Sequence, residues 1–281
     1  MRSKPKNLRE ALKSVLTPEE NKKLITSFDI IGDIAVIDIP DELAKKEKEI
    51  GNALLQVHKN IKTVCKRSGI HEGAYRVRHV EVIAGENRTE TTHKEAGVTL
   101  KLDVNEVYFT PRLCHERERI AAQVKPGETI GAFFAGVGPF PLVIVKKQPN
   151  VHIYAIELNP AAFEYLKYNI NVNGAGGSIY PICGDVREIA PPLLKERCDR
   201  ILMPLPKGGE DFLDVAMECA KKGCIIHFYQ FAPEEDPFSE AIKKVREAAK
   251  REGRKVEIVK KHVVRPYAPR VYQIVLDVKV K

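Results

Sequence analysis

The sequence predicts an α/β protein in which a mostly parallel, doubly wound sheet follows a small N-terminal α+β domain. Three observations lead to this fold class. From Glu128 onward, short apolar segments alternate with helix-like segments, which is typical of βα units in a parallel sheet. A glycine-rich turn, residues 134–140, follows the first apolar segment. The last two strand-like segments have no helix between them, which predicts a terminal hairpin and one antiparallel strand.

Three regions are expected along the chain. Residues 1–27 are predicted to be a helical extension, with Thr17 as an N-cap and Pro18 as the first helical residue. Residues 28–107 read as a small α+β domain, and residues 108–281 as the main domain with its connecting helix. In the small domain, a helix is predicted over 41–58 and strands over 28–40, 61–66, 75–84, 90–94 and 98–104.

The main domain is expected to contain seven strands and five helices after its connecting helix. The predicted strands are 129–133, 152–156, 179–183, 199–203, 223–229, 255–261 and 270–280, and the predicted helices are 138–147, 160–172, 187–196, 209–222 and 237–252. A seven-stranded sheet with an antiparallel strand near the C-terminus is the Rossmann-like arrangement of class I methyltransferases, more than of dehydrogenases.

Composition narrows the possible locations and partners. The chain has 281 residues, of which 43% are hydrophobic, and no apolar run approaches the length needed to cross a bilayer. The N-terminus leads into no apolar signal core, so we expect a cytoplasmic protein without membrane contact. The six cysteines form no C-x-x-C pair, which favours reduced thiols over a metal site or disulfides.

The net charge is +8, and basic residues concentrate between Lys59 and His79 and between Arg251 and Lys281. Such clusters are usually solvated surfaces. They become candidates for phosphate contacts if the substrate is a polyanion, so these segments are where we expect RNA to bind if RNA is the substrate.

The glycine turn predicts a nucleoside site. Gly136-Val137-Gly138 supplies two glycines of a G-x-G-x-x-G pattern, but Pro141 replaces the third, which argues against a dinucleotide. S-adenosylmethionine carries no phosphate and needs only close approach to the backbone. Glu157, at the end of the next strand, is expected to bind the ribose hydroxyls, and Asp185 to reach the adenine amino group. The alternative is a structural turn beside two solvated acids.

Seven short motifs follow one another between Tyr108 and Arg270, within a similarity that extends from about residue 30 to the C-terminus. They are Tyr108–Leu113, His115–Arg117, Phe134–Phe140, Glu157–Pro160, Gly184–Glu188, Leu205–Lys207 and Tyr267–Arg270. Together they resemble the archaeal and eukaryotic tRNA (guanine-37-N1)-methyltransferases and their wyosine-pathway relatives. The resemblance implies S-adenosylmethionine as cofactor and the anticodon loop of a tRNA as partner. The additional N-terminal domain of many members is expected to be missing.

The resemblance also implies roles for particular residues. Glu116 matches the general base, and Arg76 matches the arginine that steadies the target guanine. Tyr108 and Arg112 match residues that line the cofactor and target pocket. N1 of guanine must lose a proton while O6 gains negative charge, and a carboxylate and a cation meet those needs. The cofactor-binding residues implied are Tyr108, Arg112, Phe134, Gly136, Val137, Gly138, Glu157, Leu158, Asp185, Val186 and Pro204.

Two positions depart from the pattern of the N1-guanine enzymes. Ala132 replaces the acid at the end of the first strand, and Pro204 replaces an asparagine whose amide would hold the guanine edge. The proline resembles the archaeal subtype that methylates carbon 7 of 4-demethylwyosine, a tricyclic base, and some members of which also methylate N1. The sequence therefore favours this subtype, with tRNA-Phe as substrate and a monomeric enzyme.

Two alternatives remain open at this point. One is aminocarboxypropyl transfer to 4-demethylwyosine by the same fold, against which the motifs Asn159-Pro160 and Leu205–Lys207 weigh. The other is a non-catalytic RNA-binding protein with a relic Rossmann domain, favoured only by Ala132 and Pro204.

Overall fold

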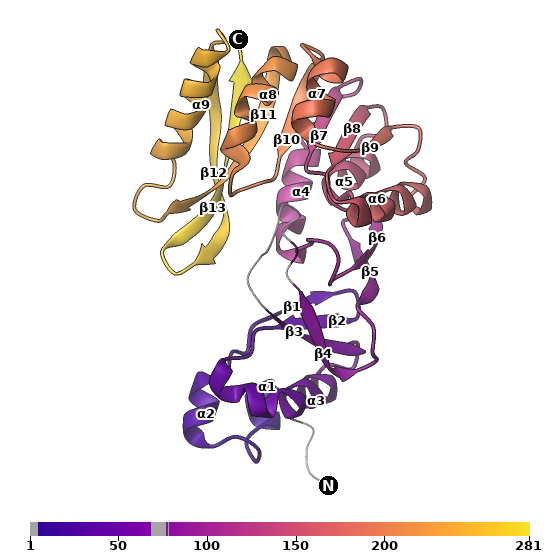
Figure 1. Cartoon of the computed structure of the whole chain (residues 1–281), viewed down its shortest axis with the longest axis vertical. Coiled ribbons are helices and arrows are strands. Elements are labelled where there is room, and N and C mark those ends of the chain that lie inside the picture. Colours follow the sequence, from indigo (N-terminus) through magenta and orange to yellow (C-terminus); the bar gives the residue numbers. More distant parts are fainter. Residues whose placement is uncertain (1–4, 69–76, 78) are drawn as a thin grey trace. The chain divides into compact units, whose positions relative to one another are not determined.

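A computed structural model describes residues 5–68, 77 and 79–281 of the chain (Figure 1). The chain divides into two compact units. The first comprises residues 1–95 and 99–112, and the second comprises residues 96–98 and 113–281. Each unit has its own sheet and its own hydrophobic core.

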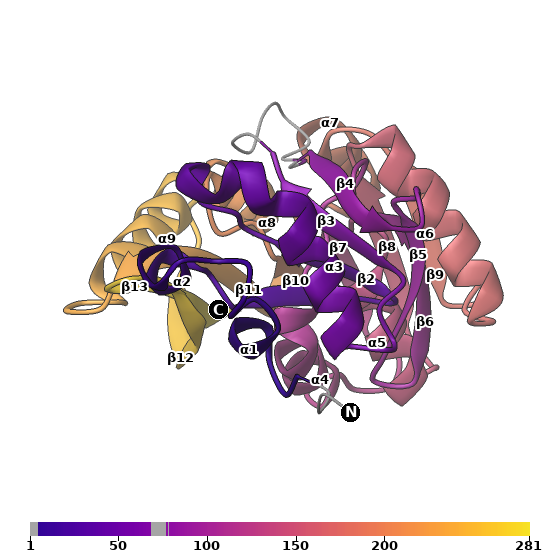
Figure 2. The same cartoon turned by 90° about the horizontal axis from the view of Figure 1, so that it is seen from below.

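The first unit contains a four-stranded sheet in the order β1-β2-β3-β4 and a two-stranded sheet of β5 and β6. Helix α3 packs on β3 and β4, and α1 packs on α3 (Figure 2). The strands are β1 (Phe28–Ile31), β2 (Ile34–Ile37), β3 (Thr63–Arg67), β4 (Val80–Gly85), β5 (Glu90–Glu95) and β6 (Val98–Asp103). The helices are α1 (Leu8–Ala11), α2 (Pro18–Lys23), the 3₁₀ helix η1 (Asp41–Lys46) and α3 (Glu47–Val57).

Local details of this unit both confirm and correct the sequence expectations. Thr17 caps α2 as predicted, since its hydroxyl accepts the Glu20 N–H at 3.2 Å and the Glu20 carboxylate accepts the Thr17 N–H at 2.8 Å. The single strand predicted over 28–40 was wrong: it is a hairpin, because Gly32 has a φ of +58° and turns the chain. Most of the start of the strand predicted over 75–84 lies outside the described residues.

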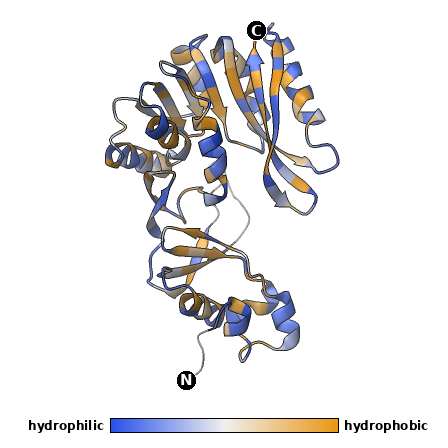
Figure 3. Ribbon diagram, turned by 180° about the vertical axis from the view of Figure 1, so that it is seen from behind, coloured by the Kyte–Doolittle hydropathy of each residue, from blue (hydrophilic) through white to orange (hydrophobic). Residues whose placement is uncertain are grey.

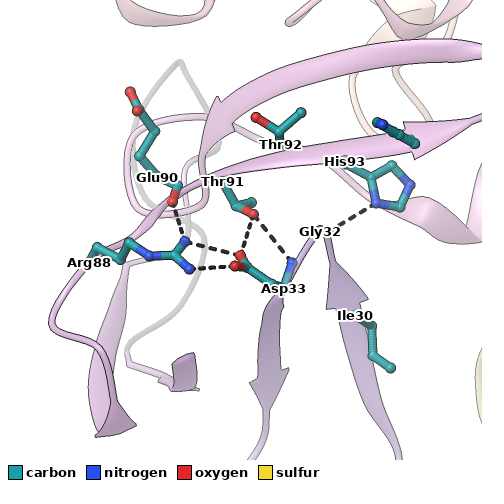
Figure 4. Close-up of a pocket in the computed structure, with 9 residues that line it drawn as sticks. Ile30, Gly32, Asp33, Arg88, Glu90, Thr91, Thr92 and His93 are labelled. Atoms are coloured by element: carbon teal, nitrogen blue, oxygen red, sulfur yellow. Dashed lines mark hydrogen bonds and ion pairs between the residues drawn. The ribbon is translucent and has the colours of Figure 1, made fainter. Parts of the chain in front are cut away.

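A polar pocket in the first unit consists of groups that satisfy one another (Figure 4). Arg88 Nη1 donates to Asp33 Oδ1 at 3.0 Å, and the Thr91 hydroxyl donates to the same oxygen at 2.8 Å. His93 Nδ1 accepts the Gly32 N–H at 3.1 Å. The hydrogen bond from Arg88 lowers the pKa of Asp33. These contacts fasten the β1–β2 turn to β5, so we assign the pocket a structural role.

The second unit contains a seven-stranded sheet in the order β12-β13-β11-β10-β7-β8-β9. Strand β13 runs antiparallel to both of its neighbours, whereas the pairs from β11 to β9 are parallel. This confirms the mixed sheet predicted from the sequence. The strands are β7 (Thr129–Phe133), β8 (His152–Glu157), β9 (Ile179–Cys183), β10 (Cys198–Met203), β11 (Ala220–Pro233), β12 (Val256–Ala268) and β13 (Val271–Val280).

Helices cover both faces of this sheet. Figures 1 and 3 view opposite sides and place α7, α8 and α9 on one face and α4, α5 and α6 on the other. The helices are η2 (Pro111–Leu113, in the first unit except for Leu113), α4 (Cys114–Ala121), α5 (Pro139–Lys147), α6 (Pro160–Val172), α7 (Val186–Leu194), η3 (Gly209–Phe212), α8 (Leu213–Cys219) and α9 (Ser239–Arg251). No helix in the described part of the chain is long and apolar enough to cross a membrane.

The terminal hairpin is longer than the sequence indicates. The expected loop over 265–270 is largely strand, because β12 continues to Ala268. Pro266 lies within this strand, next to a register shift, and β12 is the edge of the sheet. An edge strand tolerates proline because the missing N–H leaves no neighbouring strand unpaired. The prolines at 266 and 269 therefore shape the hairpin without ending it.

Candidate functional site

The glycine turn joins the end of β7 to the start of α5. Phe134, Gly136 and Gly138 have φ values of +58°, +56° and +90°. The φ of Gly138 would strain any other residue, and an added Cβ would also lie 2.6 Å from Leu166 Cδ1 of α6, which would have to shift. Phe134 occupies a backbone region that is costly for a large side chain, as often occurs at binding sites. The turn brings backbone to the edge of the sheet, where Phe134 and Gly136 are partly exposed.

Glu157, the last residue of β8, ties this turn to the start of α6. Its Oε2 accepts the Gly136 N–H at 2.7 Å and its Oε1 accepts the Asn159 N–H at 2.8 Å. Burial raises the pKa of Glu157, although both backbone N–H groups act in the opposite direction. The carboxylate is therefore held in place by neutral donors, and each oxygen keeps acceptor capacity for a hydroxyl group.

Asp185 lies beside Glu157, because β8 and β9 pair in parallel and their last residues, Glu157 and Cys183, are in register. Its Oδ1 caps α7 by accepting the Arg187 N–H at 2.8 Å, and its Oδ2 lies 3.6 Å from Arg187 Nη1. Leu158, the residue after Glu157, is exposed, and Val186, the residue after Asp185, is buried. Acceptors next to an exposed leucine suit the polar edge and the flat face of an adenine.

A stack of side chains at this edge was missed by the sequence analysis. The Phe134 ring meets the Phe212 ring edge-on at 4.8 Å, and the Arg187 guanidinium lies 3.9 Å above the Phe212 ring. Phe212 comes from η3 and belongs to no recognisable motif, so no sequence signal pointed to it. The Phe212 ring packs against Phe134, the first residue of the glycine turn.

Pro204 follows the end of β10, at the same edge of the sheet as Phe134 and Glu157. The turn that begins at Pro204 is short, and two backbone hydrogen bonds hold it in place. The Leu205 N–H donates to Met203 O at 2.8 Å, and the Phe231 N–H of β11 donates to Pro206 O at 3.1 Å. Pro204 offers an apolar ring and no N–H at a position where an asparagine would offer an amide.

Glu116 is buried on α4, a helix that Figure 3 colours largely as hydrophilic. Its Oε2 accepts Arg119 Nε at 2.7 Å, and its Oε1 accepts Arg119 Nη2 at 2.9 Å and the Tyr229 hydroxyl at 2.5 Å. Burial raises the pKa of Tyr229, so this hydroxyl keeps its proton. Tyr229 lies on β11 directly after Phe228, the partner of Met203 on β10, which puts Glu116 near the level of Pro204.

Further buried charges continue from Arg119 into the sheet. Arg119 Nη1 donates to Asp277 Oδ2 at 2.9 Å, and His227 Nδ1 donates to Asp277 Oδ1 at 2.7 Å. Arg200 Nη1 donates to His227 Nε2 at 2.7 Å and Arg200 Nε to Glu128 Oε2 at 2.8 Å. Burial lowers the pKa of His227. Burial acts to raise the pKa of Asp277, but its hydrogen bonds from His227 and Arg119 lower it well below the usual range.

Three predicted site residues are not part of this arrangement in the second unit. Tyr108 belongs to the first unit and is 49% exposed. Arg112 also belongs to the first unit, where its Nε donates to Asp29 Oδ1 at 2.5 Å. Arg76 lies outside the described residues.

The second unit thus combines the sheet of a class I methyltransferase with a candidate nucleoside site at the carboxyl edge of its parallel strands. Glu157 and Asp185 provide acceptors for a ribose and an adenine, and the turn at 134–138 admits a ligand close to the backbone. These features fit S-adenosylmethionine. Within the described residues, no three His, Cys, Asp or Glu side chains gather as metal ligands.

Comparison with known proteins gives the family. Residues 91–259 match the TRM5/TYW2 methyltransferase domain, and residues 8–89 match the TYW2 N-terminal domain. The chain belongs to the TRM5/TYW2 methyltransferase family, and it is an S-adenosylmethionine-dependent methyltransferase.

Three curated relatives illustrate the range of the family. The tRNA (guanine(37)-N(1))-methyltransferase Trm5b of Pyrococcus abyssi is 46% identical over 99% of this chain and 81% of its own length. The tRNA 4-demethylwyosine(37)-methyltransferase Taw21 of Saccharolobus solfataricus is 34% identical, over 93% and 96%. A tRNA(Phe) (4-demethylwyosine(37)-C(7)) aminocarboxypropyltransferase of Pyrococcus horikoshii is 32% identical, over 97% and 96%.

Comparison with solved structures points to the same family. The crystal structure of Trm5b from Pyrococcus abyssi matches with a TM-score of 0.89 and 45% identity, covering 100% of this chain and 82% of that one. The complex of aTrm5 with tRNALeu matches with a TM-score of 0.88 and 38% identity, covering 100% and 80%.

Proposed function

We propose that this protein transfers the methyl group of S-adenosylmethionine to N1 of guanine 37, next to the anticodon of a tRNA. The observation that carries this proposal is the buried carboxylate of Glu116, which two donors hold near the level of Pro204. The relative named for this reaction is also more similar to the chain, at 46% identity, than the relative named for 4-demethylwyosine methylation, at 34%.

Glu157, Asp185 and the backbone of the glycine turn hold the cofactor in this proposal. Glu157 accepts the ribose hydroxyls, and Asp185 accepts from the adenine amino group. Bound S-adenosylmethionine supplies an electrophilic methyl group on a sulfonium. The residues of the site orient the reactants and exclude water, and orientation provides much of the acceleration.

Glu116 removes the N1 proton. Its Oε2 accepts a single hydrogen bond from the described residues, at 2.7 Å from Arg119 Nε, so this oxygen retains a lone pair for the N1–H. Arg119 and Tyr229 fix the orientation of the carboxylate, as a general base requires. Arg76 is the proposed partner of O6, because the negative charge that develops there requires a cation.

Methylation of carbon 7 of 4-demethylwyosine is the second candidate reaction, and Pro204 is the observation that favours it. A flat tricyclic base needs more room and fewer hydrogen bonds than guanine, and proline removes a side-chain amide from the turn after β10. We propose tRNA-Phe as the substrate for this reaction and a monomeric enzyme for both. Sedimentation of the free protein and of its tRNA complex tests the monomer.

Methyl transfer from labelled cofactor to tRNA transcripts tests the function. Transcripts with guanine at position 37 are compared with transcripts that differ only by adenine or uracil there. We expect label only with guanine 37. Equal labelling of all transcripts would reject position 37.

A further inference from the structure

The tip of the β12–β13 hairpin carries an exposed pair of aromatic rings. Tyr267 of β12 stacks on Phe231 of β11, with ring centroids 3.8 Å apart and planes inclined by 25°. The Tyr267 side chain is 48% exposed even though one face meets Phe231. An aromatic ring on a surface usually buries itself against neighbours. Here the stack instead holds a second ring out in solvent, in a fixed orientation.

The pair lies at the cofactor edge of the sheet. Pairing of β10 with β11 ends at Met203 and Phe228, where the parallel strands reach the edge that bears Phe134 and Glu157. Strand β11 continues to Pro233 and remains paired with β13 to its end. The hairpin therefore projects past the edge (Figure 1). The Phe231 N–H also donates to Pro206 O at 3.1 Å, so the aromatic pair is joined directly to the turn that begins at Pro204.

Cations accompany the rings. The Arg265 guanidinium lies 5.7 Å from the centre of the Tyr267 ring, and its Nε donates to Gln273 Oε1 at 2.9 Å, which orients it. Arg270, in the turn of the hairpin, is exposed, as is Lys207. The carboxylate of Glu234 nearby on the chain is engaged, because it accepts the Tyr272 hydroxyl at 2.6 Å.

From this geometry we infer that Tyr267, seated on Phe231, is a stacking platform for an unpaired nucleobase of the substrate RNA, at position 36 or 38 beside the target. Single-stranded bases stack on exposed aromatic rings, while nearby arginines bind the phosphates. When the target base leaves the anticodon stack, its neighbour loses a stacking partner, and an aromatic ring replaces that partner. The inference rests on the proposed function, because it takes tRNA as the substrate.

The test uses the full chain and an anticodon stem-loop RNA with guanine 37. The variants are Tyr267→Ala, Tyr267→Leu and Tyr267→Phe. The matched control is Tyr168→Ala, because Tyr168 of α6 is also 48% exposed. We expect Tyr267→Ala and Tyr267→Leu to weaken RNA binding about 10-fold, and Tyr267→Phe to bind like the unchanged protein. The KM for RNA rises by the same factor, while kcat changes little.

Single abasic nucleotides then locate the stacked base. An abasic site at the stacked position costs the unchanged protein about as much as Tyr267→Ala does, and it costs Tyr267→Ala nothing further. Equal losses in both proteins at every loop position overturn the platform, as does a Tyr267→Ala affinity equal to that of Tyr168→Ala.

Two further measurements distinguish loss of the stacking platform from damage to the fold. Cofactor affinity and the thermal unfolding temperature of each variant report damage to the fold, and Tyr267→Leu keeps apolar cover over Phe231 if the alanine variant unfolds. If the unchanged protein neither binds nor methylates the stem-loop, the proposed function fails. If it does both and the variants match the control, only the platform fails.

Discussion

Two carboxylates near the same edge of the sheet, the partly buried Glu157 and the buried Glu116, have different hydrogen-bond donors. Glu157 accepts from neutral backbone N–H groups of Gly136 and Asn159. Glu116 accepts from the Arg119 guanidinium and the Tyr229 phenol. Neutral amide donors leave a carboxylate available to bind hydroxyl groups, whereas the ion pair with Arg119 fixes the orientation of Glu116. We therefore propose Glu157 as a binding acid and Glu116 as a proton acceptor, and each role can be tested by removing a single charge.

Glu157→Gln keeps the side-chain volume but turns an amide NH₂ toward one of the two backbone N–H donors. We expect cofactor affinity to fall about 10–100-fold, the usual cost of losing a charge-assisted hydrogen bond. Isothermal titration with S-adenosylmethionine measures this, and circular dichroism monitors the fold. Affinity of the unchanged protein should also fall in acid, as the carboxylate takes up a proton through its raised pKa. A Glu157→Gln protein with unaltered affinity would remove this residue from the site.

Glu116→Gln is expected to slow N1 methylation about 100-fold or more, the usual range for loss of a general base. Carbon methylation should suffer less, because carbon 7 of 4-demethylwyosine does not need the same deprotonation. Tyr229→Phe is the control: it removes the 2.5 Å hydrogen bond to Glu116 but leaves the charge. We expect about a fivefold loss from it. Equal losses for both reactions with Glu116→Gln would assign this residue a structural role only.

Sequence reasoning could predict some of these residues because their signals are local. Glu157 and Asp185 follow consecutive strands, and parallel strands bring such positions together. The hydrogen-bond partners of Glu116 and Arg119 give no such signal, because Tyr229, which donates to Glu116, and Asp277, which accepts from Arg119, lie 113 and 158 positions away from them. The run of charged residues in α4 suggests a solvent-exposed helix surface. Glu116 is nevertheless buried.

At the scale of elements, the turn after β10 is expected to select the target base. Pro204→Asn would restore a side-chain amide on a backbone that hydrogen bonds at Leu205 and Phe231 already hold. We expect the ratio of guanine N1 methylation to 4-demethylwyosine methylation to rise about fivefold, the value of one hydrogen bond. Competition between the two tRNAs in one reaction measures the ratio, and no change in it would exclude this turn from base selection.

The elements themselves followed the sequence closely wherever periodicity and caps agreed. Helix α6 begins at Pro160 after the Asn159 cap and ends at Val172, as predicted. The terminal hairpin was underestimated, because prolines at 266 and 269 indicate a loop in most contexts. Their tolerance depends on β12 being an edge strand, which only the sheet order reveals.

At the scale of the molecule, buried charges connect helix α4 with the centre of the large sheet. Asp277 of β13 receives hydrogen bonds from Arg119 of α4 and His227 of β11. Replacing Asp277 by Asn leaves Arg119 with one buried carboxylate fewer. We expect a loss of about 3 kcal/mol of unfolding free energy. Urea unfolding followed by circular dichroism measures it, and the exposed Asp214→Asn, which removes the ion pair with Arg251, should have no measurable effect.

The same groups predict that acid destabilises the second unit in two stages. The pKa of His227 is lowered on folding, so below about 6.5 the unfolded chain binds a proton that the folded protein does not. The pKa of Asp277 is also lowered, so its contribution is complete above the unfolded value of 3.8 and is lost below it. Both shifts therefore lower the free energy of unfolding of the second unit as the pH decreases. His227→Gln should flatten the decline between pH 6.5 and 5; an unchanged decline there would contradict this assignment.

The fold of the second unit was predictable because strand and helix alternate from Glu128 onward, and a doubly wound sheet needs little beyond that alternation. The preferred target base was less predictable from the sequence. Pro204 favoured the wyosine subtype, whereas relatives with higher identity carry the N1-guanine name. We propose that this single position in a turn influences specificity, which the Pro204→Asn variant tests.

Identification of the nucleoside product tests the central claim most directly. The protein is incubated with S-adenosylmethionine and two tRNA-Phe preparations, one with guanine and one with 4-demethylwyosine at position 37. The digested nucleosides are then separated and weighed by mass spectrometry. We predict 1-methylguanosine from the first and a smaller yield of 7-methylated product from the second. Methylation elsewhere in the tRNA, or an aminocarboxypropyl adduct in place of a methyl group, would contradict the account.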